Sequence, residues 1–225
     1  MPSSREILEG LARIAQEWTF VAVLWHILLA AFLLPIVKGI WRPSARTAAL
    51  AASAPLASAA AFAGVSGNAF NAAVLGAGTL TLAAITLRRG HAGLHFGSAS
   101  VRWAGAGMLL FGWLYPHFLG VKPFWYYFFA APIGLVPCPS LSIAIGLGLY
   151  FQAFGSRAWG VIAGLLGLAY GIVGVVRLGV MLDVALVAGA ALLFARSVLP
   201  HRTQHGVAGF EEGSVSATSS VTRIK

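Results

Sequence analysis

Long apolar runs without charge leave very few architectures open to this chain. The run from Trp18 to Val37, for example, contains no Asp, Glu, Lys or Arg. A helix of about 20 mostly apolar residues crosses the hydrocarbon core of a bilayer, which is about 30 Å thick. Only 9% of the 225 residues are charged, against about 25% in soluble domains, so too few polar side chains remain to cover a soluble protein. The sequence therefore predicts an all-α fold, a polytopic transmembrane helical bundle whose partner is the lipid bilayer.

Breaks between the apolar runs predict about seven spans in a transmembrane helical domain, 18–196. We expect the helices near 18–40, 47–65, 68–87, 101–120, 138–154, 158–176 and 179–195. If Arg177 does not separate the last two, they merge and the spans number six. Residues 1–17 are expected to form an N-terminal polar segment, and 197–225, rich in Ser, Thr and Gly, a disordered cytoplasmic tail.

The placement of Lys and Arg in the loops predicts the orientation in the membrane. With seven spans, four of the 15 Lys and Arg lie on the N-terminal side and the other eleven (15 − 4) on the opposite side. Because the side richer in Lys and Arg faces the cytoplasm, we expect a multi-pass protein of the cell inner membrane with its N-terminus outside and its C-terminus in the cytoplasm. The net charge of +9 does not indicate a nucleic-acid partner, since the bases are scattered between apolar runs.

Two prolines flank the single cysteine just before the fifth predicted helix. Proline fixes its own φ and lacks an N–H, and it disfavours helix at the residue before it. Pro137, Cys138 and Pro139 are therefore expected to form a stiff extended elbow, followed by an abrupt helix start. The run from Pro139 to Phe154 is short for a bilayer, which places the elbow below the outer surface. Two interpretations stay open: a helix start anchored by the aromatic segment 121–136, or a re-entrant loop lining a small site.

Ionisable residues inside the spans are candidates for function because charge is expensive in lipid. His26 is expected near the middle of the first helix and Asp183 near the outer end of the last. Each also has a structural interpretation, as a neutral histidine bonded to a neighbouring helix and as an ion pair between Asp183 and Arg177. The candidate path for a solute or ion comprises Pro137, Cys138, Pro139, Ser140, His26, His117, Arg177 and Asp183.

Five glycines share one face of the predicted helix 158–176, at spacings of four and three residues. They are Gly160, Gly164, Gly167, Gly171 and Gly174. Small residues let helix backbones approach closely in lipid. This face predicts a tight helix–helix seam, either within one chain or toward a second copy or another membrane partner.

Three motifs carry a resemblance to a known family. The run GWLYPHFLG ends the fourth predicted helix, GLVPCPSLSIAIGLGL holds the proline turn, and LLGLAYGIVGVVRLGVMLDVALVAGAALL forms the closing helix pair. Together they resemble an uncharacterised bacterial integral-membrane family, filed as domain of unknown function 6064, over roughly residues 68–195. Ser140 stands where that family usually has Thr. The resemblance implies a multi-helix membrane fold and brings no activity or ligand with it.

No residue pattern in the chain predicts catalysis, a cofactor or a metal site. The sequence has no Gly-rich phosphate loop, no H-E-x-x-H and no triad-like spacing. We therefore expect a protein without enzymatic role and without cofactor, which transports or senses a small solute or ion. The alternative is a structural or assembly subunit of a membrane complex that docks through the Gly-rich helix.

Overall fold

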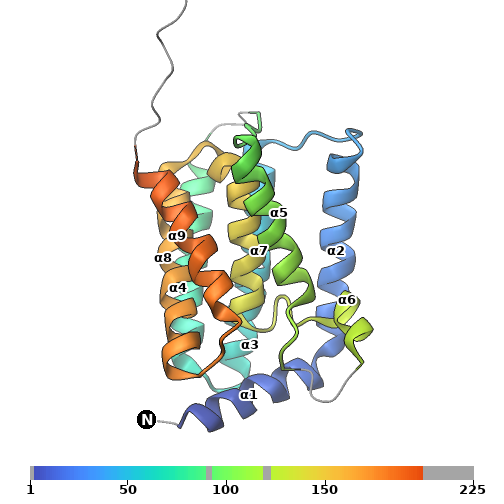
Figure 1. Cartoon of the computed structure of the whole chain (residues 1–225), viewed down its shortest axis with the longest axis vertical. Coiled ribbons are helices and arrows are strands. Elements are labelled where there is room, and N and C mark those ends of the chain that lie inside the picture. The colour runs from blue at the N-terminus through green and yellow to red at the C-terminus, as the bar shows by residue number, and fades with distance from the viewer. Residues whose placement is uncertain (1–2, 90–92, 119–122, 200–225) are drawn as a thin grey trace, which may run out of the picture.

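The structure, a computed structural model, describes residues 3–89, 93–118 and 123–199. In this part of the chain, helices run alternately between two ends of a bundle, as Figure 1 shows. The α-helices are α1 Ser4–Glu17, α2 Thr19–Val37, α3 Ala45–Val65, α4 Ala69–Leu87, α5 Ala99–Leu114, α6 Tyr127–Ala130, α7 Pro137–Tyr150, α8 Arg157–Ile172 and α9 Asp183–Val198. Three shorter helical turns are η1 Phe124–Tyr126, η2 Gln152–Gly155 and the π-helical η3 Val173–Arg177. The helical bundle expected from the apolar runs is confirmed.

Four helices among the described residues are long and apolar enough to cross a membrane. They are α2, α3, α4 and the continuous stretch Arg157–Arg177 that joins α8 to η3. By contrast α5, α7 and α9 have 16, 14 and 16 residues, roughly 21–24 Å at 1.5 Å per residue, which is short of the hydrocarbon core. Transmembrane helices are therefore supported, whereas seven full-length spans are not.

The short helices end early for local reasons. Helix α5 stops at Leu114 instead of continuing to the predicted residue 120, because Pro116 disfavours helix at Tyr115. At the other end of the chain, Gly179 takes a left-handed φ of 70° and helps reverse the backbone between η3 and α9. Helices α8 and α9 are therefore separate and do not merge into one span.

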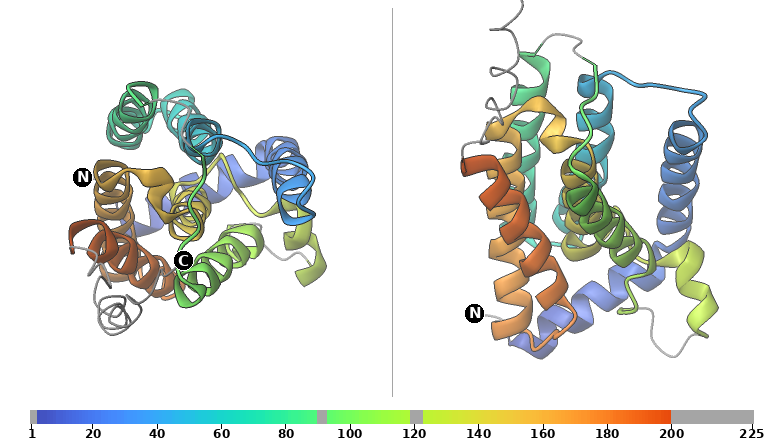
Figure 2. Two further views of the ribbon diagram at one scale, coloured as in Figure 1. Left: turned by 90° about the horizontal axis from the view of Figure 1, so that it is seen from above. Right: turned by 45° about the horizontal axis from the view of Figure 1, so that its top comes forward.

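Helix α7 lies at the centre of the bundle, as the left view of Figure 2 shows. Every residue from Pro137 to Leu149 is buried, and α3, α5, α8 and α9 contact this helix. Close contact with α5 depends on glycine: a Cβ on Gly105 would lie 2.7 Å from the carbonyl oxygen of Gly146, and a Cβ on Gly146 would lie 2.8 Å from the backbone nitrogen of Leu109. This α5–α7 seam was not predicted from the sequence.

The glycine face predicted on 158–176 is used within the chain. A Cβ on Gly164 would lie 2.9 Å from Cβ of Phe194, and one on Gly171 would lie 3.2 Å from the backbone nitrogen of Val187. Both partners belong to α9. Gly167 faces Ile145 of α7 as well as α9. The seam therefore joins α8 to α7 and α9 of the same chain.

The predicted N-terminal polar segment is an amphipathic helix, α1, which lies across one end of the bundle (Figure 1). A capping box starts it: the Glu6 N–H donates to Ser3 Oγ at 3.3 Å, and the Ser3 N–H donates to Glu6 Oε2 at 2.7 Å. Leu11 and Ile14 are buried on the inner face, as in helices that lie in a membrane interface. At the C-terminal side, α9 continues to Val198, and the predicted tail lies outside the described residues from 200 onward.

Candidate functional site

The proline turn begins helix α7 directly. Val136 is extended, with φ −119° and ψ 143°, and the helix starts at Pro137 with prolines in its first turn. The prediction of an extended elbow at Pro137–Pro139 is therefore wrong. The reason is that first-turn N–H groups have no intrahelical acceptor, so a proline there loses no hydrogen bond. The non-helical elbow lies just before, at residues 131–136, and all of it is buried in protein, as backbone at membrane depth requires.

Ser140 fastens this elbow to the first turn of α7. Its Oγ accepts from the Gly134 N–H at 2.9 Å and donates to the Val136 carbonyl at 2.7 Å. Gly134 has a φ of 75°, and a Cβ there would collide with the indole of Trp25. Helix α2 thus covers the elbow through Trp25, whose Nε1 also donates to Ser58 Oγ of α3 at 3.1 Å. The elbow is consequently a rigid, closed part of the bundle.

Asp183 is the centre of a buried polar cluster beside the elbow. Its side chain is 1% exposed although it begins α9. The Tyr115 hydroxyl donates to Oδ1 at 2.7 Å, and the Cys138 thiol donates to Oδ2 at 3.2 Å. Both donors are neutral groups, and they come from the end of α5 and the first turn of α7. The carboxyl group therefore receives two hydrogen bonds, both from uncharged donors.

The π-helical turn η3 makes room for this carboxyl group. Gly174 lies in η3, and a Cβ at that position would collide with Asp183 Oδ2. π-Helical turns often occur at functional sites, where they displace the backbone locally. Gly174, predicted from sequence only as a packing residue, therefore also shapes the surroundings of Asp183.

His117 lies near Asp183, whereas Arg177 makes no ion pair with it. Burial lowers the pKa of the half-buried His117 imidazole, and the nearby Asp183 carboxylate opposes that shift. Arg177 is exposed, and its carbonyl oxygen accepts a 2.7 Å hydrogen bond from Ser4 Oγ of α1. Among the described residues, the one salt bridge joins Arg5 and Glu9. The expected Arg177–Asp183 pair is therefore replaced by the neutral donors.

His26 has its own partners, away from the Asp183 cluster. It is 3% exposed, with Nδ1 2.8 Å from the Ala22 carbonyl and Nε2 3.1 Å from the Trp113 carbonyl. A neutral imidazole has one N–H and can donate to only one of these two acceptors, whereas an imidazolium donates to both. The Trp113 carbonyl belongs to the last turn of α5, where carbonyls lack helical partners. His26 thus joins α2 to the end of α5, as its structural interpretation expected.

The structure brings together only part of the predicted path. Cys138, His117 and Asp183 meet near one end of the bundle, while Ser140 acts in the elbow and His26 binds α5. Tyr115 was not included among the predicted site residues, although it donates the shorter bond to Asp183. Its position before Pro116, at the same end as Asp183, was the sequence signal that pointed to it.

No protein family, curated protein or solved structure matches this chain, so the chemistry of the cluster follows from its own geometry. Among the described residues, no group of three His, Cys, Asp or Glu side chains is placed to hold a metal ion. A buried carboxyl group with two hydrogen-bond donors can keep, accept or release a proton, and the hydrogen bonds to its partners can rearrange when it does. Proton binding is the reaction that this arrangement suits.

Proposed function

We propose that this chain is a multi-pass membrane protein that couples proton binding at Asp183 to the movement of a small solute or ion. The observation that carries the proposal is the burial of Asp183 with neutral donors only. Intramembrane carboxyl groups are rare, and they mark proton relays and substrate pathways. Charged side chains inside a membrane usually pair with one another or with backbone carbonyls, whereas no Lys or Arg of the described residues forms a salt bridge with Asp183.

The closed cluster fits one state of a carrier. Asp183 and Cys138 are 1% and 9% exposed, so neither is open to water in this conformation. Alternating access requires states in which the site is shielded, with discontinuous helices at its edge. The elbow before α7 and the π-helical turn after α8 are such discontinuities, and both border Asp183.

The proposal includes a topology and a location. Helices α5, α7 and α9 would cross the membrane together with the four long helices, because they run alongside them and the buried elbow and loops complete their length. We place the N-terminus outside and the C-terminus in the cytoplasm of a bacterial inner membrane. Membership of the family filed as domain of unknown function 6064 and the lack of an enzymatic role are parts of the same proposal.

The rival function, an assembly subunit docking through helix 158–176, has less support. The glycines of that helix contact α7 and α9 of the same chain, so a partner at this face would have to displace α9. Docking would instead have to use the opposite face, where Leu165, Ile172 and Val176 are exposed. Lipid can cover such an apolar face as well as a partner protein can, so its exposure does not favour docking.

Proton flux in vesicles tests the proposed function. Wild-type protein, Asp183→Asn and Glu17→Gln are reconstituted in liposomes that contain a pH-sensitive dye, and a K⁺ diffusion potential drives protons inward. We expect wild-type and Glu17→Gln vesicles to acidify faster than empty vesicles, and Asp183→Asn vesicles to match the empty ones. Glu17 is the control because it is an exposed acid at the same end of the bundle. Equal proton flux through wild type and Asp183→Asn would show that the Asp183 carboxyl group takes no part in the mechanism.

A further inference from the structure

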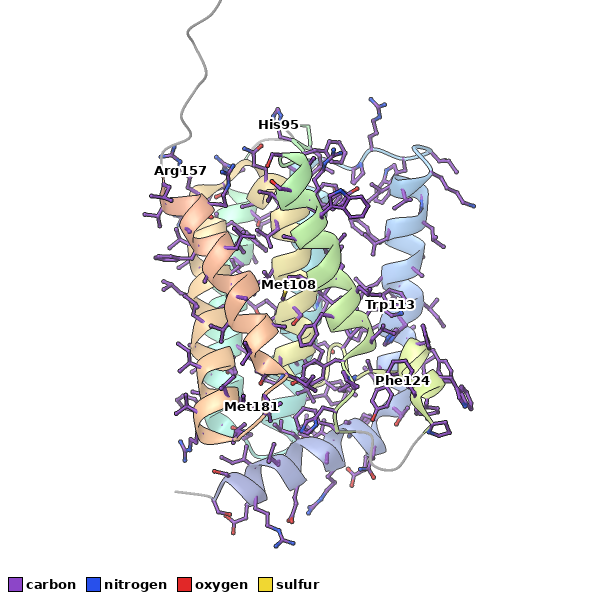
Figure 3. All side chains as sticks on the ribbon, viewed as in Figure 1. His95, Met108, Trp113, Phe124, Arg157 and Met181 are labelled. Carbon is purple, nitrogen blue, oxygen red and sulfur yellow. The ribbon has the colours of Figure 1, made fainter. Side chains whose placement is uncertain are left out.

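A second polar site lies at the end of the bundle opposite α1. A cavity of about 410 Å³ opens there between the start of α3, the end of α4 and the start of α8. Arg46, Arg88, Arg89 and His95 line it, and Trp159 forms part of its inner wall. Figure 3 shows His95 and Arg157 at this end of the molecule and Met181 at the other. We call this space the arginine cavity. It is remote from Asp183.

The positive charge of the arginine cavity has no carboxylate beside it in the part of the chain that the structure describes. The acids among the described residues are Glu6, Glu9 and Glu17 of α1 and Asp183 at the start of α9, all at the far end of the bundle. Three arginines therefore gather around one cavity, away from every described carboxylate. Guanidinium groups repel one another unless an anion lies between them, so this arrangement suits an external anion.

One of these arginines is fixed in position by an unusual turn. Arg89 Nη1 donates to the carbonyl oxygen of Gly155. Gly155 ends η2, in which Gln152, Ala153 and Phe154 all have left-handed φ values between 47° and 54°. Non-glycine residues in this region are strained, and such strain concentrates at functional sites. On the other side, a β-bridge between Ser44 and Gly93 holds the loop that carries His95. The wall of the cavity is therefore already in position before any ligand binds.

Trp159 forms part of the wall of the cavity. It is 1% exposed and lines the cavity, and its ring is held by an edge-to-face contact with Phe154, at 4.7 Å between centroids. Its indole Nε1 has no hydrogen-bond partner among the described residues, but this atom is itself inaccessible to water. The donors of this site are therefore the arginines.

We propose that the arginine cavity binds a phosphate group, held by Arg46, Arg88 and Arg89. Guanidinium groups match phosphate oxygens through paired, charge-assisted hydrogen bonds. Basic pockets between membrane helices also bind anionic lipid headgroups. The phosphate group therefore belongs either to a lipid headgroup, since exposed Leu87 and Leu50 flank this end of α4 and α3, or to free phosphate.

Binding to the full chain in detergent tests this proposal with two probes. Native mass spectrometry counts bound phosphatidic acid, with zwitterionic phosphatidylcholine as reference. Thermal unfolding in inorganic phosphate is compared with chloride at equal ionic strength, because salt screens surface charge. The variants are Arg46→Gln and Arg88→Gln, and Arg42→Gln is the control, because it removes the same charge from this end without lining the cavity.

We expect Arg46→Gln and Arg88→Gln each to weaken binding about tenfold, the loss typical of one charge-assisted hydrogen bond. Arg42→Gln should bind like wild type. Phosphatidic acid binding alone identifies a headgroup site, and stabilisation by inorganic phosphate alone identifies a free-anion site. The proposal is overturned if neither probe binds above its reference, or if Arg42→Gln weakens binding as much as Arg88→Gln does.

Discussion

Asp183 illustrates how one ionisable side chain is accommodated inside this bundle. A buried ion pair requires the desolvation of two charges, and its attraction often fails to repay that loss. Here the partners are the Tyr115 hydroxyl and the Cys138 thiol, which carry no charge to desolvate. Gly174 leaves space for the carboxyl group. The result is a buried carboxyl group in which each oxygen accepts a hydrogen bond.

Tyr115→Phe should destabilise the protein, because Asp183 Oδ1 would lose its donor inside the bundle. We expect a loss of about 1–3 kcal/mol in the free energy of unfolding, the usual penalty for an unsatisfied buried polar group. Unfolding of the purified protein by detergent titration measures it. Tyr150→Phe is the matched control, since the Tyr150 hydroxyl makes no described hydrogen bond, and it should change stability little. Similar losses in both variants would contradict the role given to Tyr115.

Among the helices, α7 depends most on its neighbours. Its 14 residues span less than a bilayer. The non-helical elbow 131–136 before it is wholly buried, and the η2 turn after it is buried at Ala153 and Phe154. Helices in lipid associate through close packing rather than through the hydrophobic effect. The α5–α7 seam supplies such packing through Gly105 and Gly146. Helix position in this bundle is thus set by small residues rather than by apolar character, which all the helices share.

Two glycines of α5 provide a test of this seam. Gly105→Ala places a Cβ against the α7 backbone and should destabilise the protein by about 1–3 kcal/mol through overpacking. Gly107→Ala meets nothing within 4 Å and should stabilise it by up to about 1 kcal/mol, because alanine favours helix over glycine. The detergent titration described for Tyr115 measures both. If Gly105→Ala raised stability as Gly107→Ala does, the seam would not be tight.

At the level of the entire bundle, the two ends differ in charge. The described acids lie at the α1 end, and the opposite end carries Lys38, Arg42, Arg46, Arg88, Arg89, Arg102, Arg157 and Arg196. The buried core between the two ends is mostly apolar and does not account for this separation. It is the arrangement that the positive-inside rule describes, so the arginine-rich end should face the cytoplasm.

Labelling of introduced cysteines tests this orientation in intact cells. The natural Cys138 is buried and should not react, so it leaves a silent background. A membrane-impermeant maleimide should label Arg13→Cys on exposed α1 from outside, and Arg42→Cys only after the membrane is permeabilised. Both variants replace one exposed arginine with cysteine, which makes them comparable. The reverse pattern would invert the proposed topology.

The sequence by itself determined that this chain forms a bundle of apolar helices, and it located most of their ends. Run length, proline position and glycine spacing are local properties, and they set helix formation and close approach directly. It also included Asp183, Cys138 and His117 among the residues of the candidate path. The sequence predicted residues 1–17 only as a polar segment and not as an amphipathic helix, because the charged residues there made its apolar face hard to recognise.

Only the tertiary structure decided which side chains meet. Tyr115 and Cys138 lie 68 and 45 residues from Asp183 in the chain, and no local periodicity links them. The arginine cavity likewise combines residues from α3, the end of α4 and the start of α8. Contacts of this kind depend on how helices of similar apolar character are ordered around α7. That order is fixed by close packing between distant segments, which a single sequence does not specify.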